Sequence, residues 1–169
     1  WTYTPEGQPD RSFGGTGIFI IPWNGNEMIR DCAIGKDGSI WVCGMWENAV
    51  NADFEAFIAK FKDNGSPDVS FQDNGFLRLE NPGRDDFMEI HIDKQGKIIV
   101  TGCYHNGTDK DMIIRRYNPG GTPDVTFNGC GYVTHHNAAG GNGDDYARGM
   151  ALDDMGTILV AGDSQAPGE

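Results

Sequence analysis

A nine-residue motif that occurs three times constrains the fold of this chain more than any other feature. It is PDRSFGGTG at 9–17, PDVSFQDNG at 67–75 and PDVTFNGCG at 123–131. A second motif repeats at a similar interval; its copies are DGSIWVCG at 37–44, QGKIIVTG at 95–102 and MGTILVAG at 155–162. Successive copies lie 56 to 60 residues apart. This period is slightly longer than that of common propeller blades, and it indicates a stack of similar units.

Each unit contains short apolar stretches that predict β-strands. SIWV, KIIV and TILV combine β-branched and aromatic residues, as in strands that are buried on both faces. A glycine follows each of them, which predicts a bulge or a close backbone approach. The predicted strands are 17–22, 28–35, 39–46 and 54–62, then 76–80, 87–93, 97–105 and 112–118, and finally 132–136, 147–153 and 157–164.

We therefore expect an all-β protein that forms a single β-propeller-type domain over residues 1–169, with blades of four antiparallel strands and three blades per chain. The expected divisions are an outer strand at 1–8 that completes a blade, blade 1 at 9–66, blade 2 at 67–122, and blade 3 at 123–169, which lacks its outer strand.

The nine-residue motif predicts a structural corner. Its Asp precedes its Phe by three residues, so the carboxylate can accept backbone N–H groups in a turn and the ring can fill the gap between two sheets. We expect the corner wherever the chain crosses from one blade to the next, with Phe71 and Phe127 mostly buried. The less favoured alternative is three copies of a ligand site.

Three longer stretches carry a resemblance to a known family: KFKDNGSPDVSFQDNGF at 60–76, RRYNPGGTPDVTFNGCGYV at 115–133 and GDDYARGMALDDMGTILVAGDS at 143–164. They resemble the delta-60 repeat of bacterial proteins. The resemblance implies β-propeller blades in a bacterial protein that is secreted or attached to the cell surface, and hence an extracytoplasmic location. It implies no catalytic motif.

The charge of the chain bears on its partners. Lys and Arg total 13 against 25 Asp and Glu, a formal net charge of −12. This balance disfavours nucleic acid and anionic membrane surfaces as partners, because both require clustered cations. No apolar run is long enough for insertion into a membrane.

The four cysteines match no metal-binding pattern. If Asp37 and Gly38 form a two-residue hairpin turn, Cys32 and Cys43 stand opposite each other. A disulfide between them and a pair of free thiols are both open, with free thiols favoured.

Four acidic residues and three aromatic residues are candidates for ligand binding. Asp85, Asp86, Asp144 and Asp145 occupy matching loops and could hold Ca²⁺, the one cofactor considered; the alternative is that they cap strand starts. Trp23, Trp46 and Tyr104 lie near Asn and Asp at strand ends, where they could bind a carbohydrate or pack between blades. His135 and His136 are adjacent on a predicted strand, so they should point to opposite faces.

These observations favour a non-enzymatic binding or scaffolding module whose ligand is a carbohydrate, a protein or a small molecule. The alternative is a propeller hydrolase or lactonase with a metal and acidic groups at the channel mouth. No catalytic residue is assigned in either case.

The N-terminus aligns with the last strand of the other units. Residues 1–5 correspond to the strand that is missing after residue 164, and propellers have about 4 to 8 blades. We therefore expect a homodimer that exchanges its N-terminal strands to form one six-bladed ring. A chain that is part of a longer propeller is the alternative.

Overall fold

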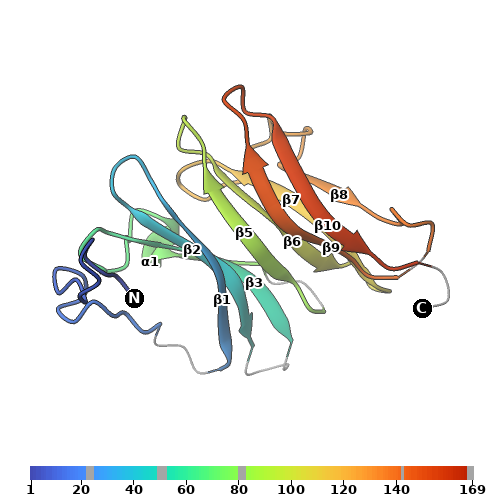
Figure 1. The fold of residues 1–169 in the computed structure, drawn as a ribbon. Helices are drawn as coiled ribbons and strands as arrows, with labels where there is room; N and C mark the ends of the chain where they lie inside the picture. The colour runs from blue at the N-terminus through green and yellow to red at the C-terminus, as the bar shows by residue number, and fades with distance from the viewer. Residues whose placement is uncertain (22–24, 49–52, 80–82, 142, 167–169) are drawn as a thin grey trace.

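The computed structural model describes residues 1–21, 25–48, 53–79, 83–141 and 143–166. These residues form two four-stranded antiparallel sheets and one two-stranded sheet, arranged side by side (Figure 1). In chain order the elements are β1 (Glu27–Ile34), β2 (Ile40–Glu47), β3 (Phe54–Phe61), α1 (Gln72–Gly75), β4 (Phe76–Arg78), β5 (Asp86–Ile92), β6 (Ile98–His105), β7 (Lys110–Tyr117), β8 (Tyr132–His135), β9 (Asp145–Leu152) and β10 (Ile158–Ser164). The expected all-β class is confirmed, because α1 is a single turn.

Sheet 1 contains β1 to β4, sheet 2 contains β5 to β8, and sheet 3 contains β9 and β10. Within each sheet the strands follow one another in chain order, so each strand pairs with the next one along the chain. The first strands, β1, β5 and β9, lie next to one another. This meander is the arrangement of a propeller blade, with its first strand innermost.

The nine-residue corner lies inside a sheet, which corrects the expectation that it crosses between blades. Residues 62–75 join β3 to β4, and these two strands pair through Ala59 with Phe76 and Phe57 with Arg78. Residues 118–131 join β7 to β8 in the same way. The expected boundaries at 66/67 and 122/123 therefore fall within sheets 1 and 2, because a strand after the corner pairs backward rather than forward.

The glycine after each apolar stretch lies opposite a β-bulge in the paired strand, as expected. Gly44, Gly102 and Gly162 lie opposite the irregular step in β1, β5 and β9. A Cβ atom at any of the three would collide with a backbone carbonyl oxygen of the paired strand. Only glycine allows the bulged strand to approach so closely.

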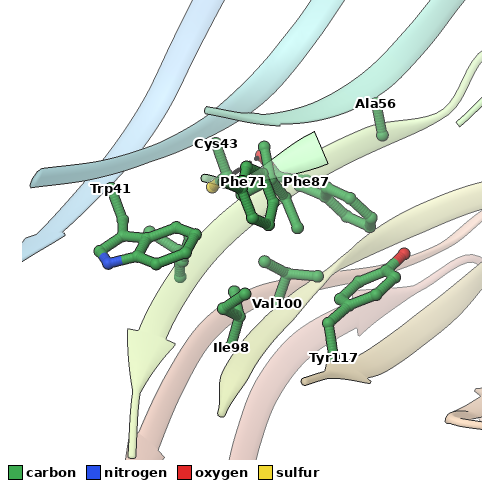
Figure 2. Packing of buried hydrophobic residues seen from close by; sticks show 10 residues of the cluster. Trp41, Cys43, Ala56, Phe71, Phe87, Ile98, Val100 and Tyr117 are labelled. Carbon is green, nitrogen blue, oxygen red and sulfur yellow. Dashed lines mark hydrogen bonds between the residues drawn. The ribbon is translucent and has the colours of Figure 1, made fainter. Parts of the chain in front are cut away.

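The main core fills the interface between sheets 1 and 2 (Figure 2). Trp41 and Cys43 from β2 face Ile98 and Val100 from β6, and the ring of Phe71 lies in the same cluster. The rings of Trp41 and Phe71 meet edge to face, with centroids 5.0 Å apart. Burial of these large side chains is the main stabilising contribution to this interface.

The N-terminal segment, residues 1–21, covers the other face of sheet 1. Phe19 and Ile21 pack against a second cluster that contains Phe57, Ala59 and Phe61. No strand is assigned within residues 17–21, and residues 1–8 take part in one isolated bridge, between Tyr3 and Pro9. The predicted strand at 17–22 is therefore wrong over its described residues.

The corner carboxylates make the expected turns. Asp68 Oδ1 accepts the N–H of Ser70 at 3.1 Å, and Asp124 Oδ1 accepts that of Thr126 at 3.2 Å. Phe71 has no exposed surface, as expected. Phe127 is only half-buried, because sheet 3 has no described outer strands that would cover it.

The first hairpin is longer than the two-residue turn expected at Asp37 and Gly38. Ile34 pairs with Ile40, so the connection spans residues 35–39 and the register shifts by one. Cys32 consequently lies opposite Val42, on the other face of the sheet from Cys43. Cys32, Cys43, Cys103 and Cys130 are all free thiols.

The described residues contain no helix of the length and apolar character needed to cross a membrane.

Candidate functional site

Six of the seven candidate ligand residues lie at one end of the sheets. This end, which we call the loop end, is where β5 and β9 begin and where β2 and β6 finish; it includes residues 83–85, 106–109 and 136–141. It carries Asp85, Asp86, Asp144, Asp145, Trp46 and Tyr104. Trp23, the seventh candidate, lies outside the described residues.

The strand register shows which acidic residues occupy equivalent positions in sheets 2 and 3, and the first of one Asp pair is not equivalent to the first of the other. Phe87 lies opposite Gly102, and Ala147 lies opposite the equivalent Gly162. Asp85 is therefore equivalent to Asp145. Both are buried and accept backbone N–H groups: Asp85 from His105 at 2.8 Å, and Asp145 from Asn137 at 2.7 Å.

The other two acidic residues link neighbouring sheets. Asp86 accepts hydrogen bonds from Arg30 of sheet 1, at 2.6 Å from Nη2 and 3.0 Å from Nε. Burial raises the pKa of Asp86, and the Arg30 guanidinium acts against this rise. Such a bidentate pair fixes the relative position of β1 and β5.

Asp144 joins β9 to sheet 2. It accepts the backbone N–H of Lys110 at 3.0 Å and the Tyr146 hydroxyl at 2.7 Å. Burial alone would raise the pKa of Asp144, but the hydrogen bonds from Tyr146 and Lys110 lower it. Across the described residues, the four acidic candidates do not gather into one set of metal ligands.

The aromatic candidates have different surroundings. Trp46 packs on the second core cluster, and the guanidinium of Arg78 lies 4.6 Å from its ring centroid. Tyr104 instead donates its hydroxyl to Asp111 Oδ2 at 3.2 Å. Burial, followed by this contact with Asp111, raises the pKa of Tyr104.

Tyr104 belongs to a group of polar side chains that sequence analysis missed. We call this group the hairpin cluster; it consists of Tyr104, Asn106, Asp109, Asp111 and His136. His136 Nδ1 lies 2.7 Å from Asp111 Oδ1, and Asn106 Nδ2 donates to Asp109 at 2.6 Å and to Asp111 at 3.0 Å. Both carboxylates are buried, whereas Asn106 and His136 reach solvent.

Two carboxylates and an imidazole are groups that can bind zinc. The ligand atoms of Asp109, Asp111 and His136 lie within 4.8 Å of one another. However, the Asn106 side-chain oxygen accepts the N–H groups of Thr108 and Asp109, which fixes the orientation of the amide. Its N–H₂ group therefore points between the two carboxylates, where a cation would have to lie, and the cluster fits a hydrogen-bonded hairpin better than a metal site.

Part of this cluster has a signal in the sequence. Asp109 directly precedes β7 and Asp111 is its second residue, so these two acidic side chains are close together in the sequence itself. His136 joins them only because β8 returns across the corner to pair with β7, with Met112 opposite His135. Because the corner was expected to lie between blades, sequence analysis did not place His136 beside Asp109 and Asp111.

One family comparison agrees with the architecture. Residues 96–127 match the family model described as "Domain of unknown function (DUF5122) beta-propeller". The matched stretch covers β6, β7 and most of residues 118–131, which join β7 to β8. The sheets are of the β-propeller type. A search of curated proteins found no match.

Proposed function

We propose that this chain is a non-enzymatic binding or scaffolding module of the β-propeller type, and that its ligand surface is the hairpin cluster. The observation that carries the proposal is the placement of Tyr104, Asn106 and His136 at a solvent-facing hairpin, where hydrogen bonds to two buried carboxylates hold them in position. An aromatic ring beside planar hydrogen-bonding groups suits the alternating apolar faces and hydroxyl groups of a sugar. A carbohydrate is thus the favoured ligand among the classes considered.

The carboxylates at the loop end support binding over catalysis. Asp85, Asp86 and Asp144 are each engaged by donors from the chain itself. A general acid or base must reach the proton that it transfers, and these hydrogen bonds direct the three carboxylates toward neighbouring strands. The hydrolase or lactonase alternative would need such groups to converge on a substrate.

Titration with a panel of neutral oligosaccharides, followed by calorimetry, tests the proposal. We expect binding to be lost in Tyr104→Ala, which removes the ring, and weakened in Tyr104→Phe, which removes only the hydroxyl. Tyr132→Ala is the matched control, because Tyr132 is an exposed aromatic residue outside the cluster. Absence of binding across the panel, or equal loss in the Tyr132 variant, would contradict a sugar site at this hairpin.

Assays with ester and lactone substrates test the alternative. Turnover that rises with a divalent metal and falls in Asp85→Asn would favour the enzyme over the binding module.

Calcium binding by Asp85, Asp86, Asp144 and Asp145 stays a hypothesis. A site filled at a hundredfold excess over its dissociation constant would stabilise the fold by about 2.7 kcal/mol. Thermal unfolding with and without millimolar Ca²⁺ measures this, and an unchanged midpoint would count against the site.

The origin and location of the protein belong to the same proposal. The resemblance to delta-60 repeats supports a bacterial protein that acts outside the cytoplasm, in secreted form or at the cell surface. Fractionation of cells that produce the natural protein, with detection by antibody, tests this; recovery in the cytoplasmic fraction alone would contradict it.

A further inference from the structure

The N-terminal segment occupies the place of a preceding blade. Phe13 packs against Gly65 in the connection between β3 and β4, just as Phe71 packs against Gly121 in the connection between β7 and β8. The backbone N–H of Gly14 also donates to the carbonyl of Asn64 at 2.8 Å. The segment therefore contacts sheet 1 as the corner of sheet 1 contacts sheet 2.

The segment also has the internal hydrogen bonds of a blade's outer half. The bridge between Tyr3 and Pro9 is equivalent to that between Phe61 and Pro67. The N–H of Thr2 donates to Gly17 at 2.9 Å, a bond whose equivalent in sheet 2 joins Arg116 to Gly131. Residues 1–21 thus have the structure of the end of a third strand, a corner and the start of a fourth strand.

Sheet 3 is the complementary inner half. Its two strands are equivalent to the first two strands of sheets 1 and 2, and no further strand pairs with β10 among the described residues. Ile40 pairs with Phe61 in sheet 1. At the equivalent positions, Ile158 of β10 would pair with Tyr3, Leu159 with Thr2, and Val160 with Trp1.

Apolar side chains are exposed where this pairing would cover them. Leu159 is 69% exposed, whereas the equivalent Trp41 is 3% exposed in the interface between sheets 1 and 2. On sheet 1, at the other end of the row of sheets, Ile29 of β1 is 47% exposed, whereas the equivalent Phe87 of β5 is 1% exposed. Ile34, further along β1, is 78% exposed. The exposed surfaces of sheet 3 and sheet 1 thus correspond to the two sides of the interface that sheets 1 and 2 form within the chain.

The corners show the same complementarity. Phe127 is half-buried, although the equivalent Phe71 is covered by Gly121 and its neighbours. Gly7 is equivalent to Gly65 and Gly121, and open space surrounds the position of its missing Cβ. Phe127 of one chain would fill the space at Gly7 of another.

We propose that a second copy of this chain covers both surfaces: β9 and β10 of each copy dock beside residues 1–21 of the other and complete a four-stranded blade. The N-terminal segment keeps its place on its own sheet 1, so docking requires no strand to move. Two copies docked in this way contain six blades between them, which lies within the range of about 4 to 8 that propellers have. Two copies therefore close one six-bladed ring by a two-fold axis, and no filament forms.

Light scattering during size-exclusion chromatography tests the proposal on the purified chain. The expected mass is about two chains of 18.4 kDa. Leu159→Asp and Ile34→Asp should each reduce it to one chain mass, since a charge placed in the interface would be desolvated without a partner. Both side chains are exposed in the single chain, so the fold of the monomer should survive, as circular dichroism can verify.

Val69→Asp is the matched control. Val69 is 61% exposed although it belongs to the corner of sheet 1, beside the complete interface, and its equivalent Val125 is 64% exposed. This variant should keep the dimer. A monomeric wild-type chain, a ladder of larger masses, or a dimer that both Leu159→Asp and Ile34→Asp leave intact would overturn the proposal.

Discussion

The interface between sheets 1 and 2 differs from that between sheets 2 and 3, although the same motifs build both. In the first, the corner ring of Phe71 has no exposed surface and meets Trp41 edge to face. In the second, Phe127 stands at the equivalent position but is half-buried, with the guanidinium of Arg116 4.8 Å from its ring centroid. The comparison shows that the corner motif keeps the same Asp-to-N–H turn in both sheets, whereas the burial of its ring depends on the next sheet.

The largest expected effect follows from the two corner rings. Phe71→Ala should lower the free energy of unfolding by about 3–5 kcal/mol, because it removes a fully buried ring from a packed core. Phe127→Ala should cost clearly less in the single chain, since part of that ring already meets solvent. Urea unfolding of both variants in the monomeric Leu159→Asp background measures the difference, and equal losses there would break the comparison.

The glycines opposite the bulges give the next largest effect. A Cβ at Gly102 would collide with the carbonyl oxygen of Asp86, so Gly102→Ala should cost about 1–3 kcal/mol. Gly162→Ala makes the same collision with Tyr146, but in a two-stranded sheet that can shift more freely. We expect a smaller loss there, again by urea unfolding in the monomeric Leu159→Asp background; an equal or larger loss at Gly162 would show that sheet 3 is as constrained as sheet 2.

Much of this architecture is predictable from sequence, because it depends on local chemistry. The Asp of each corner accepts an N–H two residues later, and each bulge requires its glycine, whatever the rest of the chain does. These features repeat as residue types at fixed spacing. The all-β class follows from them directly.

The features that could not be predicted depend on which strands pair with each other and in which register. The pairing of β4 with β3 rather than with β5 sets where a blade ends, and no local signal distinguishes the two. Because the 35–39 connection is longer than the expected turn, the register shifts by one residue, and Cys32 lies opposite Val42 instead of Cys43. Because strand side chains alternate between faces, an error of one residue reverses the predicted surroundings of every side chain.

A third prediction compares equivalent side chains of the two interfaces. Cys43 Sγ lies 3.6 Å from the carbonyl oxygen of Phe87, whereas the buried hydroxyl of the equivalent Thr101 has no hydrogen-bond partner within the described residues. Thr101→Val replaces that hydroxyl with a methyl group and should stabilise the fold by about 1 kcal/mol. Thermal unfolding measures the change. A loss of stability would indicate that the hydroxyl is satisfied in solution.

The smallest expected effect concerns the corner carboxylates, which should behave alike in both corners even though the rings do not. Hydrogen bonds from Lys60, at 2.8 Å, and Ser70 lower the pKa of Asp68 to about 2, from 3.8. Hydrogen bonds from Thr126 and Lys97 lower that of Asp124 as well. A carboxyl whose pKa is lower in the folded state stabilises the fold above its unfolded pKa. For Asp68 this contribution is therefore complete above about pH 4 and is lost as the pH falls toward about 2.

The loss should be about 1 kcal/mol or less for Asp68, since solvent screens a carboxylate near the surface. Asp68→Asn should flatten the fall in stability between pH 4 and pH 2, and Asp124→Asn should flatten it in the same direction. Urea unfolding at a series of pH values measures both slopes. If Asp124→Asn left the slope unchanged while Asp68→Asn reduced it, the corner at 123–131 would depend on the next sheet both to form its turn and to bury its ring.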